Sequence, residues 1–301
     1  MKASLDMTYP RSHLVDSDSP GFYHVVSRCV RRSWLCGFDS DSGRSYDHRR
    51  DWIEKRIEQL SHLFSVEVYA YAVMSNHYHL VVRLDPTENN RWPEKEVAAR
   101  WVDIQPPTTA GLIDAVLRQL KINDILDDTN RVSVLRNRLS SLSWFMRFIN
   151  HPIACIANQE DGCTGHFWES RFKTFALLDE ESVIACMAYV DLNPIRANAA
   201  RNLLESKHTS IRYRLIEGRQ QLCPIWSQST TRGLNITFNQ YTAYLSRTGI
   251  LKDSRAPPDM RTRARVMSMA TYQRVFGGAD TIASWCRRVG QHWIHGIPLP
   301  M

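Results

Sequence analysis

The chain of 301 residues contains 43% hydrophobic and 23% charged residues, which excludes a collagen-like or wholly disordered protein. Lys and Arg number 38 against 31 Asp and Glu, which gives a net charge of +7, and 31 of the cations are Arg. The planar guanidinium suits phosphate, so this excess favours a nucleic-acid partner, although a GC-rich genome that encodes its positive charge as Arg would explain it equally well.

The N-terminal part of the chain predicts strands and one helix. Short apolar runs rich in strand-forming residues, bounded by Pro, Gly or Asn, predict the strands. Apolar side chains at helical spacing, among them Trp52, Ile57 and Leu60, predict an amphipathic helix. In chain order the segments are a polar tail over 1–20, a strand over 22–28, a polar loop over 39–50, a helix over 51–64, and strands over 66–73 and 77–83 joined by a turn at 74–76.

After residue 84 the pattern is mainly helical. Pro152 lies within a helical pattern, and we expect it to kink or break the helix because proline lacks the backbone N–H. Asp179 suits the N-cap of a further helix, which ends within a residue or two of Pro194. The segments are an inserted loop or short helices over 85–110, helices over 111–127 and 133–158, an extended segment over 165–178, the helix from 180, a linker over 255–265 and a short helical region near 266–289.

The cysteines and the apolar stretches indicate the cellular compartment in which the protein is expected. Seven cysteines are scattered without a CxxC pair, so we expect neither a disulfide framework nor a zinc ribbon, and a reduced cytoplasm fits best. The acidic first twenty residues contain no apolar run of the signal-peptide kind. The longest apolar stretches, at 69–74 and 183–190, are too short to cross a membrane. We therefore expect a cytoplasmic protein with no membrane partner.

His77-Tyr78-His79 is the sharpest local feature. Side chains alternate across a strand, so His77 and His79 share one face, about 7 Å apart, and Tyr78 points to the other. Two imidazoles on one face can share a metal ion or hold a phosphate. The alternative is a pair of ordinary strand histidines on a solvated face.

Tyr189 and Asn193 are the second candidate pair. They are separated by four residues on a predicted helix, so they share a face of it. Tyr189 offers a hydroxyl nucleophile, and Asn193 offers an amide oxygen, which is a hard ligand suited to Mg²⁺ or Mn²⁺. A buried core tyrosine and an asparagine that ends the helix ahead of proline would explain the same pair.

Three ordered motifs together resemble one family. They are VMSNHYHL at 73–80, GHFWESRFK at 165–173 and AYVDLNPIRA at 188–197. The chain is similar to the HUH single-tyrosine transposases, and within them to the REP-associated tyrosine transposases. The resemblance covers about residues 20–200. Ser75 stands where family members often have proline, and residues 85–140 are longer than in compact members.

The resemblance implies an α+β fold. Its expected core is a ferredoxin-like antiparallel sheet with helices on one face and the HUH motif on a central strand. A largely helical insertion and a C-terminal extension are added to this core. The strand, helix, strand, strand order agrees with such a fold. The implied parts are a tail over 1–20, a catalytic domain over 21–204 with an insertion at about 85–140, and a basic extension over 205–301 that binds DNA or packs against the domain.

The resemblance also implies site roles. His77 and His79 are the expected ligands of Mg²⁺ or Mn²⁺, with Asn193 as a third ligand. Tyr189 is the expected nucleophile, which attacks single-stranded DNA and leaves a 5′-phosphotyrosine and a free 3′-hydroxyl. Since the pKa of tyrosine is near 10, a metal or a neighbour must stabilise its phenolate. The residues expected at the DNA are Arg28, Arg31, Arg32, His166, Arg171, Lys173 and Arg196.

These inferences converge on a metal-dependent single-stranded DNA endonuclease and strand transferase that acts on hairpin-forming repeat DNA, as a monomer or a homodimer. A non-cleaving hairpin-binding protein on the same fold is one alternative, and a metal hydrolase that uses water is another.

Arg171 and Lys173 alternate with Phe172, so we expect both cations on one side. Phe167 and Trp168 either stack on unpaired bases or belong to the core.

Overall fold

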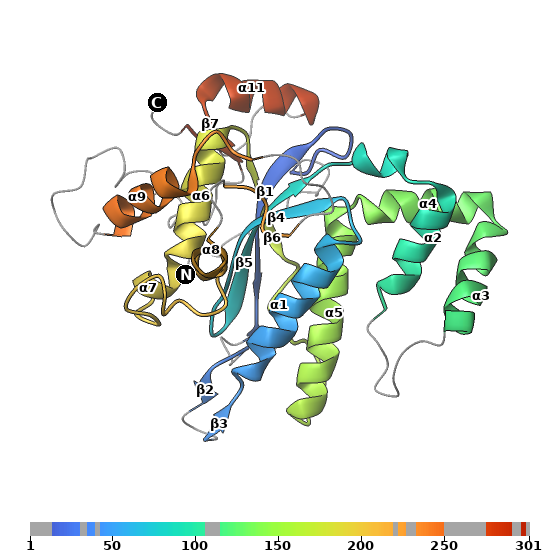
Figure 1. Ribbon diagram of the computed structural model, residues 1–301, viewed down its shortest axis with the longest axis horizontal. Helices are drawn as coiled ribbons and strands as arrows, with labels where there is room; N and C mark the ends of the chain where they lie inside the picture. The colour runs from blue at the N-terminus through green and yellow to red at the C-terminus, as the bar shows by residue number, and fades with distance from the viewer. Residues whose placement is uncertain are drawn as a thin grey trace, which may run out of the picture.

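The computed structural model describes residues 14–30, 35–39, 43–105, 115–218, 222–226, 233–249, 275–290 and 296–298. Within these ranges the chain forms a six-stranded sheet in the order β4-β5-β1-β6-β7-β8, with helices on both of its faces (Figure 1). The result is a mixed α+β fold. No described helix is both long enough and apolar enough to cross a bilayer.

Four strands form the antiparallel part of the sheet: β1 (Gly21–Arg28), β4 (Val66–Val73), β5 (His77–Leu84) and β6 (Lys173–Leu177). β5 is an interior strand, because it pairs with β4 on one side and with β1 on the other. β1 also pairs with β6. The helix α1 (His48–Ser61) lies between β1 and β4 in the chain, so the predicted order of strand, helix, strand and strand is confirmed.

The sheet differs from the expected one in two ways. First, β7 (Val275–Gly277) and β8 (Gly296–Pro298) pair in parallel, β7 with β6 and β8 with β7, so the sheet is not wholly antiparallel. Second, helices cover both faces rather than one. All eight residues of β4 are buried, since its sequence VEVYAYAV carries apolar side chains on each face, and both faces therefore need a cover.

Each face of the sheet has its own core. On one face, α1 and α5 (Leu142–Glu160) pack against side chains such as Tyr78 and Leu80. On the other face, α6 (Glu180–Asp191) covers Tyr69, Val81 and Phe175, with α8 (Ser210–Glu217) and α9 (Phe238–Gly249) beside it. Alternate residues of one strand therefore enter different cores.

The inserted segment after β5 is helical, as predicted. Its elements are the 3₁₀ turn η3 (Glu88–Arg91) and the helices α2 (Glu94–Asp103), α3 (Ala115–Leu126) and α4 (Thr129–Leu139). The helical segment over 133–158 was expected to kink or break at Pro152, but the chain is interrupted earlier, between α4 and α5 near Ser140. Pro152 lies inside α5 without ending it, since buried residues on both sides, Ile149 and Ile153, hold the helix against the core.

Two further local predictions were incomplete. The segment expected as a loop over 39–50 contains β3 (Arg44–Ser45), which pairs with β2 (Phe38–Asp39), and the first residues of α1. The extended segment over 165–178 is a regular strand only from Lys173. By contrast, the predicted cap of α6 is confirmed, because the Asp179 side chain accepts a hydrogen bond from the Ser182 backbone N–H at 2.8 Å.

The chain after residue 205 contributes to the main sheet and its packing. Trp226 forms a bridge to Val68 on β4, and α11 (Ala279–Arg288) follows β7. Arg214 lies among the cations Lys207, Arg212 and Arg219, a pattern that by itself predicts a solvated helix face. It is instead buried, and its guanidinium donates to the Tyr69 carbonyl oxygen at 2.6 Å. This arginine therefore stabilises the fold and does not lie on a solvated face. The linker expected over 255–265 lies outside the described residues.

Candidate active site

His77 and His79 lie on one face of β5, as the alternation of a strand requires. Their ring centroids are 4.8 Å apart, and the rings are nearly perpendicular, at 83°. Tyr78 points to the opposite face, where its buried hydroxyl donates to Asn150 Oδ1 at 2.6 Å. The strand thus presents both imidazoles toward α6 and holds Tyr78 in the core under α5.

A third histidine, which the sequence analysis missed, joins this pair from β1. His24 Nε2 lies 3.0 Å from His79 Nδ1, and the two rings stack with centroids 5.2 Å apart. Both residues are almost fully buried, with exposed fractions of 6% for His24 and 4% for His79. One sequence signal existed, because His24 is the polar residue within the apolar run from Phe22 to Val26 of the predicted strand.

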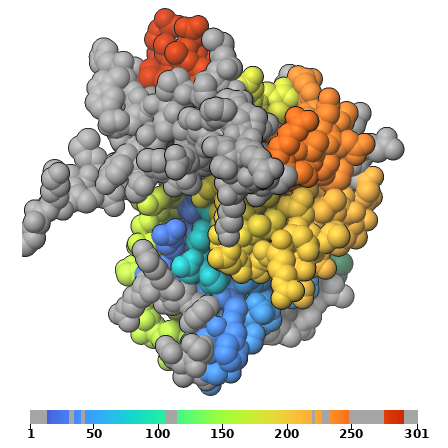
Figure 2. All heavy atoms as spheres, turned by 90° about the vertical axis from the view of Figure 1, so that its left-hand side faces the viewer, coloured from blue at the N-terminus to red at the C-terminus, as the bar shows by residue number. Residues whose placement is uncertain are grey.

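α6 and the short helix α7 (Asn193–Arg196) bring the second candidate pair to the same place. Asn193 Nδ2 lies 3.1 Å from His79 Nε2. The Tyr189 ring centroid lies 5.6 Å from that of His79 and 6.0 Å from that of His24. The chain therefore brings His77, His79, Tyr189 and Asn193 together, although more than a hundred residues separate the two pairs. In Figure 2, atoms from the blue and teal ranges, which include β1 and β5, reach the surface beside the yellow helices.

The contacts of His79 define one tautomer. With the Asn193 amide oriented as in the structure, its N–H donates to His79 Nε2, so this nitrogen carries a lone pair. The ring proton is then on Nδ1, which donates to His24 Nε2. The tautomer presents His79 Nε2 on the side where Tyr189 and Asn193 lie.

Burial changes the protonation of the whole cluster. Desolvation lowers the pKa of His24 to about 3, with His77 adding to the effect, and lowers the pKa of His77 to about 4, with Arg28 adding to it. Desolvation also lowers the pKa of His79 well below its usual range. The imidazoles are therefore neutral near pH 7, and a neutral imidazole is the form that binds metal.

The pKa of Tyr189 is raised, mainly because the phenol is desolvated. Two cations act in the opposite direction. The Arg196 guanidinium lies 5.5 Å from the centroid of the Tyr189 ring, and Arg28 adds a weaker attraction for the phenolate. The resting side chain is a neutral phenol, and the positive charges of Arg196 and Arg28 partly offset the effect of burial by favouring the phenolate.

The donor set fits a divalent cation. His77 and His79 supply neutral imidazole nitrogens, and Asn193 supplies an amide whose oxygen is a suitable hard ligand when it faces the histidines. A separate group of ligand types lies near α1, where Asp51, Glu54 and His208 have ligand atoms within 4.8 Å of one another. Hydrogen bonding between His208 Nδ1 and Glu54 Oε2, at 2.7 Å, accounts for that second group without an ion.

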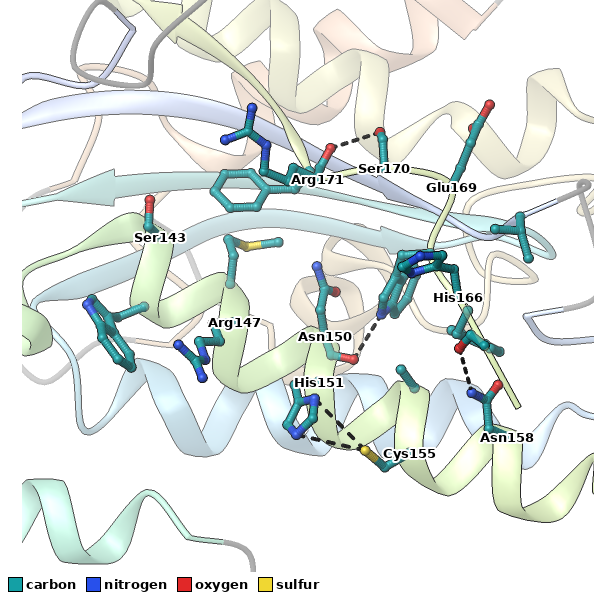
Figure 3. Close-up of a pocket in the computed structure, with 18 residues that line it drawn as sticks. Ser143, Arg147, Asn150, His151, Cys155, Asn158, His166, Glu169, Ser170 and Arg171 are labelled. Atoms are coloured by element: carbon teal, nitrogen blue, oxygen red, sulfur yellow. Dashed lines mark hydrogen bonds between the residues drawn. The ribbon is translucent and has the colours of Figure 1, made fainter. Parts of the chain in front are cut away.

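The residues expected at the DNA fall into two sets. Arg28 lies directly opposite His77 in the pairing of β1 and β5. Lys173, on β6, lies opposite Val26 of β1, and the Arg196 guanidinium lies over the Tyr189 ring. Arg171 and His166 instead line a groove beside α5 (Figure 3). Because β6 begins at Lys173, the strand alternation expected to place Arg171 beside it does not reach that residue. Arg31 and Arg32 lie outside the described residues.

Comparison with known proteins adds one distant likeness. No protein-family model matches the chain, and no curated protein matches it. Among solved structures, a REP-associated tyrosine transposase bound to a REP hairpin is similar, with a TM-score of 0.41 and 11% sequence identity, over 76% of this chain and 98% of that chain. A likeness this distant assigns no activity and no ligand to the chain.

Proposed function

We propose that the chain is a metal-dependent endonuclease and strand transferase for single-stranded DNA, which forms a 5′-phosphotyrosine and acts on hairpin-forming repeat DNA. One observation carries the proposal. A tyrosine and an amide from α6 and α7 meet two neutral histidines of an interior strand, and Asn193 Nδ2 lies 3.1 Å from His79 Nε2. A nucleophile placed against a set of metal ligands is the arrangement that phosphoryl transfer requires.

The topology supports the proposal independently. Leaving β7 and β8 aside, the sheet order is β4-β5-β1-β6, and helices α1 and α5 lie on one face between successive strands. This order is compatible with the ferredoxin-like arrangement that the sequence resemblance implies, and the two histidines lie on the interior strand β5. Arg28, Lys173 and Arg196 place positive charge around the same face, where a phosphate would lie.

The chemistry follows from the positions of the side chains. A divalent cation held by His77, His79 and Asn193 would neutralise charge on the scissile phosphate and orient the leaving oxygen. Tyr189 loses its phenolic proton to solvent, and its Oη forms a bond to phosphorus while the bond from phosphorus to the 3′ oxygen breaks. The 3′ oxygen leaves and takes up a proton. Arg196 and Arg28 favour the phenolate, and the phosphotyrosine keeps the bond energy needed to rejoin strands.

Covalent trapping tests the proposal. A labelled DNA hairpin with single-stranded flanks is incubated with the full chain and Mg²⁺ or Mn²⁺, and protein–DNA adducts are separated under denaturing conditions. We expect an adduct with wild type and none with Tyr189→Phe. The matched control is Tyr46→Phe, because Tyr46 is only half-buried and phenylalanine keeps the ring that contacts Arg49.

The outcomes separate the alternatives. An adduct that persists in Tyr189→Phe would show that another residue is the nucleophile. Cleavage by wild type without any adduct would indicate a hydrolase that uses water. Hairpin binding with no cleavage under either metal would indicate a non-cleaving DNA-binding protein.

A further inference from the structure

A groove of about 1020 Å³ runs along α5, on the opposite face of the sheet from Tyr189 (Figure 3). One wall comes from α5 and includes Trp144, Arg147 and His151, and the other comes from residues 165–172. The groove and the histidine site lie on different faces because α5 packs under Tyr78, whose neighbours His77 and His79 point the other way. Its volume is at the upper end of the range for pockets of small ligands, so it can hold more than one planar group.

The lining combines flat aromatic rings with positive charge. Trp144 and Trp168 are half-buried, and Arg147 lies over the Trp144 ring, 4.9 Å from its centroid. Arg147 and Arg171 are exposed, and neither forms an ion pair with a carboxylate in the described part of the chain. Glu169 is the one acidic side chain among the described residues that line the groove. Aromatic faces beside unpaired guanidinium groups suit a polyanion that also presents flat rings.

Hydrogen bonds hold the Trp168 ring of the groove in place. Trp168 Nε1 donates to the Asn150 carbonyl oxygen at 2.8 Å. The Asn150 side chain accepts from Tyr78 and donates to Ser27 Oγ at 3.0 Å. Trp168 is therefore fixed to both α5 and the central strands, so a base that stacks on it finds a ring already ordered, and little side-chain entropy is lost on binding.

The same wall is attached to the end of β1 beside the histidine site. The Glu169 backbone N–H donates to the Arg28 carbonyl oxygen at 2.8 Å, and Cys29 forms a bridge with Trp168. Arg28 is the residue opposite His77 in the pairing of β1 with β5. The groove and the histidine site therefore both lie beside the end of β1 at Arg28, one on each face of the sheet.

We propose that this groove binds unpaired nucleotides of the same DNA strand that reacts at Tyr189. The strand passes around the end of β1 at Arg28, with bases stacked in the groove on one face of the sheet and the scissile phosphate on the other. Stacking requires free base faces, which a duplex does not offer, so the occupant is single-stranded. This inference rests on the proposed function, and it assigns a substrate-binding role to residues away from the reacting atoms.

Binding measurements on the full chain test the groove without relying on cleavage. The probe is a fluorescent, unstructured DNA of about 16 nucleotides, the upper end of a single-strand site on one domain. We expect Arg147→Gln/Arg171→Gln to bind it about tenfold more weakly, with a salt slope lower by about 1.4, because two phosphate contacts are lost. The matched control is Arg131→Gln, an exposed arginine of α4 away from the groove, which should bind as wild type does.

Photocrosslinking then locates the strand. A 5-iodouracil form of the same probe is bound to Tyr189→Phe, which removes the reacting hydroxyl and leaves the groove intact. Adducts on peptides that contain Trp144, His166 or Trp168 are the expected result. Adducts confined to the α6 side, or unchanged affinity and salt slope in the double variant, would overturn the groove while leaving Tyr189 as the nucleophile. Groove adducts in a wild-type protein that forms no covalent intermediate would uphold the groove and overturn the proposed function.

Discussion

His24 Nε2 lies 3.0 Å from His79 Nδ1, and this contact joins a histidine without a sequence motif to one within it. With the Asn193 amide donating to His79 Nε2, the proton of His79 lies on Nδ1 and His24 Nε2 accepts it. A ligand histidine whose other nitrogen is held by a neighbour keeps its ring orientation and its basicity. His24 is therefore a positioning residue for His79.

Replacing His24 tests that role. His24→Phe keeps a flat buried ring but removes the acceptor for His79 Nδ1, so we expect Mn²⁺ to bind about 10- to 100-fold more weakly. Titration calorimetry with Mn²⁺ measures the affinity, and circular dichroism checks the fold. His62→Phe, an exposed histidine at the end of α1, is the control. Equal Mn²⁺ affinity in His24→Phe and wild type would remove the positioning role.

Metal removal should stop cleavage more than binding. His77→Ala removes one expected ligand from a half-buried site, and a chelator removes the cation itself. In both cases we expect loss of strand cleavage, whereas affinity for single-stranded DNA should fall only a few-fold because arginine contacts with phosphate dominate it. Cleavage gels and fluorescence anisotropy on the same samples measure the two effects. Full cleavage in the presence of chelator would exclude the ligand assignment.

Asp191 should stabilise the folded state. Its buried carboxylate accepts hydrogen bonds from the Ser210 hydroxyl, the Ile211 backbone N–H at 3.0 Å and the Tyr241 hydroxyl at 2.6 Å. These bonds tie the end of α6, two residues after Tyr189, to α8 and α9. We expect Asp191→Ala to lower the free energy of unfolding by about 3 kcal/mol, because buried donors lose their partner, and Tyr241→Phe to lower it by about 1 kcal/mol. Urea denaturation measures both.

Equal urea midpoints for Asp191→Ala and wild type would contradict this account.

The same contacts determine what a deletion of the C-terminal third would do. Deleting residues 205–301 would remove the partners of Asp191 together with Trp226 and β7, and would expose both cores. Point substitutions are therefore the appropriate way to test a DNA-binding role for the C-terminal third.

Glu54 should make stability depend on acid pH. Burial alone would raise its pKa, but hydrogen bonds from His208 and Tyr71 outweigh burial and lower the pKa below its ordinary value. A lowered folded-state pKa contributes stability above the unfolded pKa of about 4.5, and this contribution is lost as pH falls through the folded value. The stability difference between wild type and Glu54→Gln should therefore be largest near neutral pH and shrink below about pH 4.5. Urea midpoints at several pH values measure it, and a difference independent of pH would be inconsistent with the hydrogen bonds from His208 and Tyr71 to the Glu54 carboxylate.

Most of the candidate site could be predicted from the local periodicity of strands and helices in the sequence. The alternation of a strand is enough to place His77 and His79 on one face and Tyr78 on the other. The spacing of four residues also brings Asn193 to the site of Tyr189, although α6 ends at Asp191 and Asn193 begins α7, so the two do not share one helix as expected. The cap at Asp179 is also a local property, since its side chain bonds a backbone group three residues away. The strand alternation and the helix cap depend only on neighbours in the chain, and both are confirmed.

Features that depend on distant pairing could not be predicted in this way. His24 reaches His79 only because β1 pairs with β5 in the register that sets Val26 opposite His79. Arg171 and Lys173 do not lie on one face of a strand, because β6 begins only at Lys173, the first residue of β6 that pairs with β1. Pro152 stays helical because the core on both sides of it outweighs one lost hydrogen bond.

The sequence by itself determined most of the residues of the candidate site, although not His24, because residue type and short-range spacing decide what a side chain can do and which neighbours share its face. The tertiary structure alone decided that helices cover both faces, that β7 and β8 extend the sheet in parallel, and that a groove beside α5 meets the histidine site at the end of β1. Each of these results depends on burying apolar surface between segments far apart in the chain. Such long-range burial has no periodic signature in the sequence.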